Sequence, residues 1–135
     1  KKMSTFNAFR ELNHLRWVTF TQIVTNAVNA ARQDGFSMNY WPEAIANLDE
    51  FAALVSALDL VVTVCNTTVH YAGAVGTAAW ILAPTVPEWR YGLSNRSLPW
   101  YPSSVMYRQA RAGDWSSVID SICHDLRERY PAQVI

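Results

Sequence analysis

Apolar residues recur at helical spacing between residues 47 and 59. Asn47 is followed three residues later by Glu50, which approximates a capping box, and Asp49 is an alternative cap. We therefore predict a helix over 47–59. Its apolar face, at positions i, i+3, i+4 and i+7, consists of Phe51, Leu54, Val55 and Leu58.

A short apolar run at residues 60–65 follows this helix. It is rich in β-branched residues, which is typical of a parallel strand that is buried on both faces. Asn66, Thr67 and Thr68 come next and supply side-chain oxygens of the kind that cap a helix. We predict that this helix runs from about Thr68 to the residue before Gly76, which terminates it.

The rest of the chain continues the alternation of helices and strands. Helix follows strand in succession, which favours an α/β fold with a Rossmann-like parallel sheet flanked by helices. The additional predicted elements are helices over 5–15 and 23–32, strands over 17–20, 36–40 and 78–82, and a final helix capped by Asp114.

Residues 83–107 show few periodic apolar positions, and we predict a long loop there. Its aromatic residues allow two interpretations. In the first, it is an Ω-like loop that its own aromatic side chains pin to the core. In the second, it forms the rim of a ligand cleft, with Trp89 at the rim and Arg90 available to a phosphate or carboxylate. The aromatic residues are Trp89, Tyr91, Trp100, Tyr101 and Tyr107.

Composition narrows the class of protein. The 135 residues suit a single globular domain over 1–135, with 50% hydrophobic and 13% aromatic residues. The formal net charge of zero argues against a nucleic-acid or anionic-membrane partner. We find no transmembrane segment and no signal peptide, so we expect a soluble cytoplasmic protein. Cys65 and Cys123 lack metal-ligand spacing, and we expect no metal site.

The predicted helix after the strand at 60–65 points to an anion site. Ligands of open α/β sheets bind at the carboxyl ends of the strands, where this helix begins. Its first N–H groups lack internal partners and carry the positive end of the helix dipole, so they suit a phosphate. Asn66, Thr67, Thr68 and His70 are the candidate ligands. The alternative is that the threonines only cap the helix and His70 lies on its flank.

An ordered series of motifs resembles a known family of enzymes. The resemblance is to the C-terminal lobe of bacterial glycosyltransferases that carry tetratricopeptide repeats, which are similar to heptosyltransferases and more distantly to O-GlcNAc transferase. It covers about Trp41 to Leu126. The motifs are residues 59–76, Trp80-Ile81-Leu82, residues 87–92, Pro99-Trp100-Tyr101-Pro102, Arg108-Gln109 and Asp114-Trp115.

The resemblance implies a GT-B architecture, in which two Rossmann-like lobes face each other and the C-terminal lobe binds a nucleotide-sugar donor. Thr67 and Thr68 would then contact the donor diphosphate, with His70 beside it. Gln22 would lie near the base or ribose. The donor would be a UDP-, GDP- or ADP-linked sugar, and no cofactor or metal would be needed because the helix start and hydroxyl donors stabilise the leaving diphosphate.

The sequence departs from that family in several ways. Residues Ile23-Val24-Thr25-Asn26 follow Gln22 where the family has a glycine-containing turn, and Thr77-Ala78 stands where a Lys-Pro pair is usual. The N-terminal lobe and the repeats are absent, so the catalytic residues remain unknown. We therefore interpret the chain as an excised donor-binding lobe that is inactive alone. An uncovered apolar patch would then favour a homo-oligomer, by association or by exchange of residues 4–34.

Three functions of different classes remain open. The first is the donor-binding lobe of a glycosyltransferase. The second is a non-catalytic binding or interaction module derived from that fold, which the altered turn after Gln22 favours. The third is an unrelated dinucleotide-binding domain, which the lack of a G-x-G-x-x-G motif after any predicted strand disfavours.

Overall fold

The structure is a computed structural model that describes residues 16–19, 29, 32–35 and 37–131. The chain divides into two compact units. One unit comprises Asp49–Ile122, and the other comprises Lys1–Leu48 together with Cys123–Ile135. The predicted single domain over 1–135 stays a prediction.

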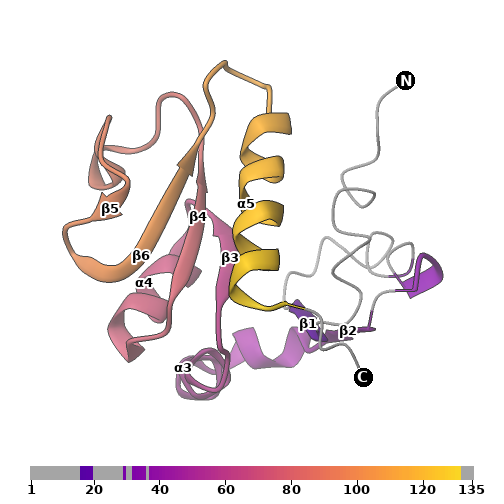
Figure 1. The fold of residues 1–135 in the computed structure, drawn as a ribbon. Helices are drawn as coiled ribbons and strands as arrows, with labels where there is room; N and C mark the ends of the chain where they lie inside the picture. The colour runs from indigo at the N-terminus through magenta and orange to yellow at the C-terminus, as the bar shows by residue number, and fades with distance from the viewer. Residues whose placement is uncertain (1–15, 20–28, 30–31, 36, 132–135) are drawn as a thin grey trace. The chain divides into compact units, whose positions relative to one another are not determined.

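The unit Asp49–Ile122 is built on a four-stranded sheet in the order β3-β4-β6-β5. Three neighbouring strands are parallel, and β5 pairs antiparallel with β6 (Figure 1). The α/β class is therefore confirmed, although the sheet is mixed rather than purely parallel. The strands are β3 (Val61–Val64), β4 (Ala79–Ala83), β5 (Ser97–Leu98) and β6 (Tyr101–Arg108).

β4 is one of the two inner strands of the sheet and has the largest number of buried residues among them. Four of its five residues are buried, because it pairs with β3 on one side and β6 on the other. The prediction that the strand at 60–65 is buried on both faces was wrong. β3 is an edge strand in the described sheet, and Val64 is 51% exposed. Its β-branched composition indicated a strand but not a central position.

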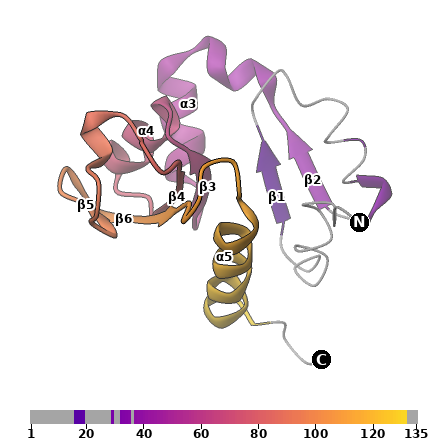
Figure 2. The ribbon, with the colours of Figure 1, turned by 90° about the horizontal axis from the view of Figure 1, so that it is seen from above.

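The helix α4 (Thr67–Val75) confirms the predicted boundaries to within one residue. Asn66 is its N-cap, and Gly76 ends it with φ +80°, a left-handed conformation that favours glycine. Buried Val69 and Ala72 are on the side of α4 that packs against β3, β4 and β6. α4 covers one face of the sheet, and the first turns of α5 (Ser116–Arg129) run along the other face (Figures 1 and 2).

The helix α3 (Leu48–Ser56) confirms part of its predicted apolar face, with Phe51 and Val55 buried. It ends three residues before the predicted end at 59, so Leu58 lies outside it. Its contact with α4 is partly aromatic, since the rings of Phe51 and Tyr71 meet edge to face at 4.8 Å between centroids. A buried hydrogen bond adds to it, because the Thr77 hydroxyl donates to the Val55 carbonyl at 3.0 Å. These two contacts hold α3 against α4 and the residues that follow it.

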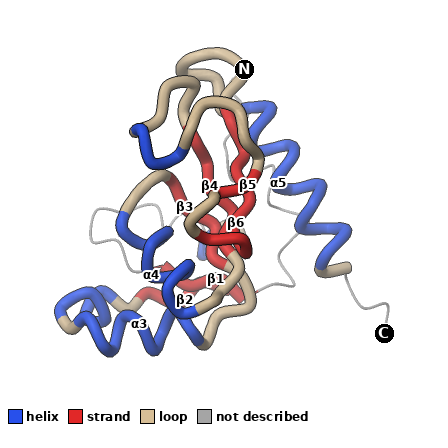
Figure 3. Tube along the Cα trace, turned by 90° about the vertical axis from the view of Figure 1, so that its left-hand side faces the viewer, coloured by secondary structure: helices blue, strands red, loops and turns tan. Residues whose placement is uncertain are grey.

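The predicted loop over 83–107 was wrong at its C-terminal end. Residues from Tyr101 onward form β6, the longest strand of the sheet, and residues 97–98 pair with it as β5 (Figure 3). A short 3-10 helix, η4 (Trp89–Tyr91), lies within the remaining loop. The segment that connects β4 to β6 is therefore partly ordered by backbone hydrogen bonds as well as by aromatic packing.

The other unit contains a two-stranded parallel sheet. β1 (Arg16–Thr19) pairs with β2 (Ser37–Tyr40), and both strands confirm their predicted positions. The 3-10 helix η3 (Pro42–Ala46) follows β2. Gly35 adopts φ +90° in the turn before β2, and the predicted helices over 5–15 and most of 23–32 lie outside the described residues.

The helix α5 begins two residues after Asp114, whose carboxylate accepts a hydrogen bond from the Ser116 N–H at 3.0 Å. Asp114 thus caps the helix as predicted. The buried residues of α5 are Val118, Ile122, Cys123 and Leu126. In the part of the chain that the structure describes, no helix combines the length and apolar character that crossing a bilayer requires.

Candidate functional site

The start of α4 lies at the carboxyl edge of the sheet. In the parallel register Val64 pairs with Leu82, and Ala83 pairs with Arg108, so β3, β4 and β6 end at the same edge. The turn at 65–66, the loop that follows β4 and the residue Gln109 therefore leave the sheet on one side. This is the edge at which ligands of open α/β sheets bind.

Asn66 accepts hydrogen bonds from two of the backbone N–H groups in the first turn of α4. Its side-chain Oδ1 accepts from the Thr68 N–H at 2.9 Å, and its carbonyl accepts from the Val69 N–H at 3.2 Å. The Thr63 hydroxyl also donates to Oδ1 at 3.3 Å. Asn66 is therefore the helix cap. Among the described residues, the N–H of Thr67 is left without a partner, and the Thr67 side chain is exposed.

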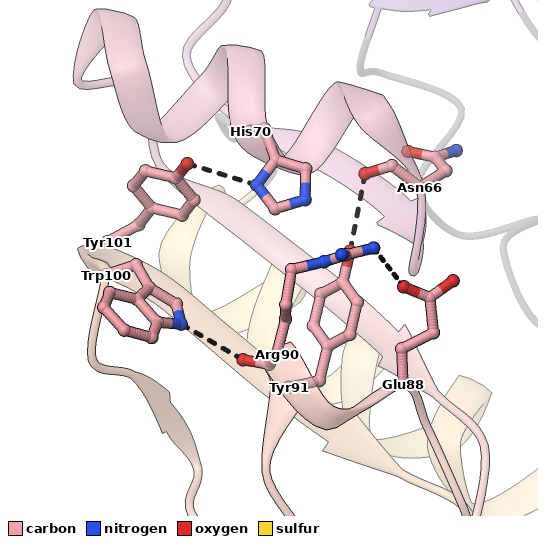
Figure 4. Close-up of polar contacts among 7 residues, drawn as sticks. All are labelled: Asn66, His70, Glu88, Arg90, Tyr91, Trp100 and Tyr101. Atoms are coloured by element: carbon pink, nitrogen blue, oxygen red, sulfur yellow. Dashed lines mark hydrogen bonds and ion pairs between the residues drawn. The ribbon is translucent and has the colours of Figure 1, made fainter.

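His70 follows one turn later on α4 and is half-buried. Its Nδ1 lies 3.1 Å from the hydroxyl oxygen of Tyr101, at the start of β6, and the two rings meet edge to face at 5.7 Å (Figure 4). Sequence reasoning placed His70 near the ligand and Tyr101 among the aromatic residues of the predicted loop, without linking the two. The two residues are 31 positions apart, and only the pairing of β6 with β4 brings them together.

Tyr91 joins the loop after β4 to the start of α4. Its ring is buried, at 2% exposure, and its hydroxyl donates to the Asn66 carbonyl at 3.5 Å. Burial raises the pKa of the Tyr91 hydroxyl, and the nearby Cys65 and Glu88 raise that pKa further. The neutral side chain of Tyr91 therefore links η4, to which it belongs, with the start of α4. The sequence pattern placed Tyr91 among the loop aromatics but did not reveal this contact.

The candidate rim residues Trp89 and Arg90 lie on the loop after β4. Trp89 is 77% exposed, and the Arg90 guanidinium lies 5.7 Å from the centre of its ring. Arg90 also forms an ion pair with Glu88, and both side chains are exposed (Figure 4). The Trp100 indole N–H donates to the Arg90 carbonyl at 3.3 Å. The Arg90 guanidinium is thus exposed, but the Glu88 carboxylate already pairs with its charge.

Arg108, at the carboxyl end of β6, is a charged residue for which sequence reasoning assigned no role. Its guanidinium donates to the backbone carbonyls of Tyr91 and Asn95, which ties the loop to the sheet. Its Nη1 is buried and has no hydrogen-bond partner. No carboxylate among the described residues pairs with it. The signal in the sequence was the Arg108-Gln109 pair within the resemblance.

The positive charge of Arg108 influences the pKa of Cys65, in the turn that precedes α4. Burial raises the pKa of the Cys65 thiol, Arg108 lowers it, and Glu88 raises it. Cys65 adjoins Asn66 in the chain, so the charge of Arg108 acts close to the start of α4. Gln109 also has a buried Nε2 without a partner. Both residues leave donors unused at the carboxyl edge of the sheet.

The structure brings together most of the predicted site. Asn66, Thr67, Thr68 and His70 share the first two turns of α4 and the residue before it, and the Tyr91 hydroxyl links this helix start to the loop that carries Trp89 and Arg90. Gln22 lies outside the described residues. No group of three His, Cys, Asp or Glu residues in the described ranges is placed to hold a metal ion.

Comparison with known proteins gives one significant similarity to report. The chain is 30% identical to Protein FlbA of Caulobacter vibrioides over 135 aligned positions, which cover 95% of this chain and 22% of FlbA. The chain thus spans less than a quarter of the length of that relative. No protein-family model matches the chain. No solved structure matches it significantly.

Proposed function

We propose that the unit Asp49–Ile122 is the nucleotide-sugar-binding lobe of a glycosyltransferase. The observation that supports this best is the start of α4 at the carboxyl edge of the parallel strands, with exposed Thr67 at its first position. An unpaired N–H and the positive end of the helix dipole act there together. In this proposal the diphosphate of the donor binds at Thr67 and Thr68.

Several side chains support an anion at this position. Thr67 is exposed, and the second ring nitrogen of His70 faces away from Tyr101, toward Arg90 and Tyr91 (Figure 4). In this proposal Arg90 exchanges its surface ion pair with Glu88 for a phosphate, at little cost because exposed ion pairs contribute only about 0–1 kcal/mol. The positive charge of the half-buried Arg108 adds a favourable field near the turn.

In such a lobe the protein acts on the leaving group. As the bond between sugar and diphosphate breaks, negative charge grows on the diphosphate, and fixed N–H and O–H donors stabilise that charge without a metal ion. The described residues would bind and orient the donor. The acceptor and the catalytic base would belong to a facing lobe of GT-B type, so we expect the chain by itself to bind a nucleotide without catalysing transfer.

The resemblance to tetratricopeptide-repeat glycosyltransferases supports the same proposal. Three of the six motifs that carry it, residues 59–76, 87–92 and 108–109, include parts of the structure that converge on the carboxyl edge, namely the turn before α4, the loop with η4 and the end of β6. In that family the donor is a UDP-, GDP- or ADP-linked sugar. A full-length protein would then transfer a sugar to an acceptor whose chemistry the facing lobe decides.

An amide-resolved NMR titration tests the proposal. The chain is titrated with UDP, GDP, ADP and CMP, and the Thr67→Ala/Thr68→Ala variant is titrated in parallel. The matched control is Ser116→Ala/Ser117→Ala, which removes two exposed hydroxyls at the start of α5 instead. We expect one nucleotide to shift residues 66–71 selectively, in the wild type and the control but not in the threonine variant.

A non-catalytic interaction module is the second candidate. Asn66 already satisfies two N–H groups of the first turn of α4, and Glu88 already neutralises Arg90, so a ligand must compete with contacts inside the protein. This candidate predicts no selective shifts at millimolar nucleotide. That result, obtained with a folded chain, would contradict the donor-binding function of this unit.

A further inference from the structure

His70 and Tyr101 form a pair that neither sequence pattern nor resemblance assigns. The Tyr101 hydroxyl oxygen lies 3.1 Å from His70 Nδ1, and both side chains are half-buried. The ring of Tyr101 approaches the edge of the imidazole, with 5.7 Å between centroids. The hydrogen bond is thus supported by ring packing.

Gly73 makes room for this arrangement. A Cβ atom at Gly73 would lie 2.1 Å from Tyr101 Cγ and 2.2 Å from Cδ1, so no other residue type fits there while the ring keeps its position. Gly73 lies three residues after His70 on the same helix, and residues at that spacing share a face. The Tyr101 ring therefore rests on the backbone of α4, with its hydroxyl directed toward His70.

We propose that Tyr101 is a positioning residue that holds His70 as the Nε2–H tautomer and so directs its N–H toward the anion site at the start of α4. In a neutral imidazole one nitrogen donates and the other accepts, and the hydrogen bond at one nitrogen decides the state of the other. When the Tyr101 hydroxyl donates to Nδ1, the proton resides on Nε2. This proposal rests on the proposed function, because that function supplies the anion.

The direction of the second ring nitrogen of His70 explains why the tautomer matters for binding an anion. Figure 4 shows the second ring nitrogen of His70 on the side of the ring that faces Arg90 and Tyr91, away from Tyr101. As a donor, this nitrogen adds a hydrogen bond to a phosphate oxygen. In the opposite tautomer it would present a lone pair to that oxygen and weaken binding. Tyr101 thus acts through His70 and does not itself contact the ligand.

Nitrogen NMR of the histidine ring in the free protein tests the tautomer directly. At about pH 9, where a histidine side chain in solution is neutral, two-bond proton–nitrogen spectra show which ring nitrogen carries the proton. We expect Nε2–H in the wild type, with the Nδ1 resonance displaced by the hydrogen bond. In Tyr101→Phe that displacement should vanish. The matched control Tyr71→Phe removes the neighbouring phenol of α4 and should leave both nitrogens unchanged. A proton on Nδ1 in the wild type would overturn the proposal.

Gly73→Ala provides an independent variant, because it keeps both hydrogen-bonding groups and displaces the ring that joins them. The nitrogen resonances should change as they do in Tyr101→Phe. A wild-type spectrum from a folded Gly73→Ala protein would show that the close approach does not position His70.

Nucleotide affinity completes the test. For the nucleoside diphosphate that the wild type binds, Tyr101→Phe and His70→Ala should each weaken binding by about three- to tenfold, the range expected for one hydrogen bond. The double variant should bind no worse than His70→Ala, because Tyr101 acts through His70. Additive losses would contradict this. If the wild type binds no nucleotide, the proposed function fails, whereas the tautomer assignment still stands or falls on the nitrogen spectra.

Discussion

Gly73 and Tyr101 are in closer contact than any side chain at residue 73 would allow, since an added Cβ would lie 2.1 Å from the ring. This contact joins the middle of α4 to the first residue of β6. It also sets the position of the hydroxyl that reaches His70. The close packing of α4 against β6 at this point therefore requires glycine at residue 73.

Gly73→Ala should destabilise the unit despite the better helix propensity of alanine. Alanine is favoured over glycine in a helix by up to about 1 kcal/mol, but overpacking costs about 1–3 kcal/mol. We expect a net loss in the free energy of unfolding by urea. In a Tyr101→Ala background the overlap is absent, so there the same substitution should be neutral or stabilising. A similar loss in both backgrounds would argue against the contact.

Two substitutions of Asn66 should distinguish its effect on helix capping from its effect on anion binding. Asn66→Ala should lower the free energy of unfolding by about 0.5–2 kcal/mol, because the Thr68 N–H loses its acceptor. Asn66→Asp keeps a cap and adds a negative charge at the positive end of the helix dipole. It should therefore retain the stability and abolish nucleotide-induced shifts at residues 66–71. Undiminished nucleotide binding by Asn66→Asp would place the anion elsewhere.

Thr77→Val should leave the Val55 carbonyl without its side-chain donor. Thr77 is 7% exposed and donates to that carbonyl at 3.0 Å. The carbonyl keeps the Leu58 N–H as a donor at 3.2 Å, so the variant loses one buried hydrogen bond, which contributes about 0.5–1.5 kcal/mol. Valine nearly matches the shape of threonine, so urea unfolding should report this loss. Thr85→Val, at a half-buried position in the loop after β4, is the matched control and should change stability by less.

Asp114 should contribute a stability that depends on pH. The hydrogen bond from the Ser116 N–H lowers its pKa in the folded state below the ordinary value of 3.8. The stabilisation is therefore fully present above that value and is lost as the pH falls through the folded pKa. In Asp114→Asn the free energy of unfolding should vary less with pH below about pH 4 than in the wild type. Identical acid profiles for the two proteins would show that the cap bond is absent.

Cys65 should react slowly with alkylating reagents in the folded protein. Burial raises the pKa of its thiol, and the thiolate is the reactive form. At about pH 8, iodoacetamide should modify Cys65 more slowly than it modifies the same cysteine in the urea-unfolded chain, as mass spectrometry of the Cys65 peptide will show. Arg108→Lys, which preserves the charge, should keep the rate close to that of the wild type. Equal rates in the folded and unfolded chains would contradict the raised pKa.

Local elements with strong signals at both ends were predictable from the sequence. The helical spacing of Phe51 and Val55 indicated α3, and Asn66 and Gly76 marked the ends of α4. Each of these signals acts within one or two turns of the chain. A cap or an apolar face therefore reveals itself without knowledge of the partner on which the element packs.

β6 escaped sequence reasoning because its pattern is not that of an isolated strand. Pro102, Ser103 and Ser104 interrupt its apolar positions, and its pairing partner β4 begins 22 residues earlier. Backbone hydrogen bonds to β4 decide its structure, and those bonds are non-local. The same reason explains why β3 proved to be an edge strand, since β-branched residues favour a strand wherever it lies in the sheet.

The sequence by itself thus determined the α/β class, the helix that begins at the carboxyl edge of the sheet and the polar residues at its start. Only the tertiary structure decided which groups surround that start. Tyr91 reaches Asn66 across 25 positions of the chain, and Tyr101 reaches His70 across 31. Contacts at such separations arise from strand pairing and close packing, which leave no local periodicity in the sequence.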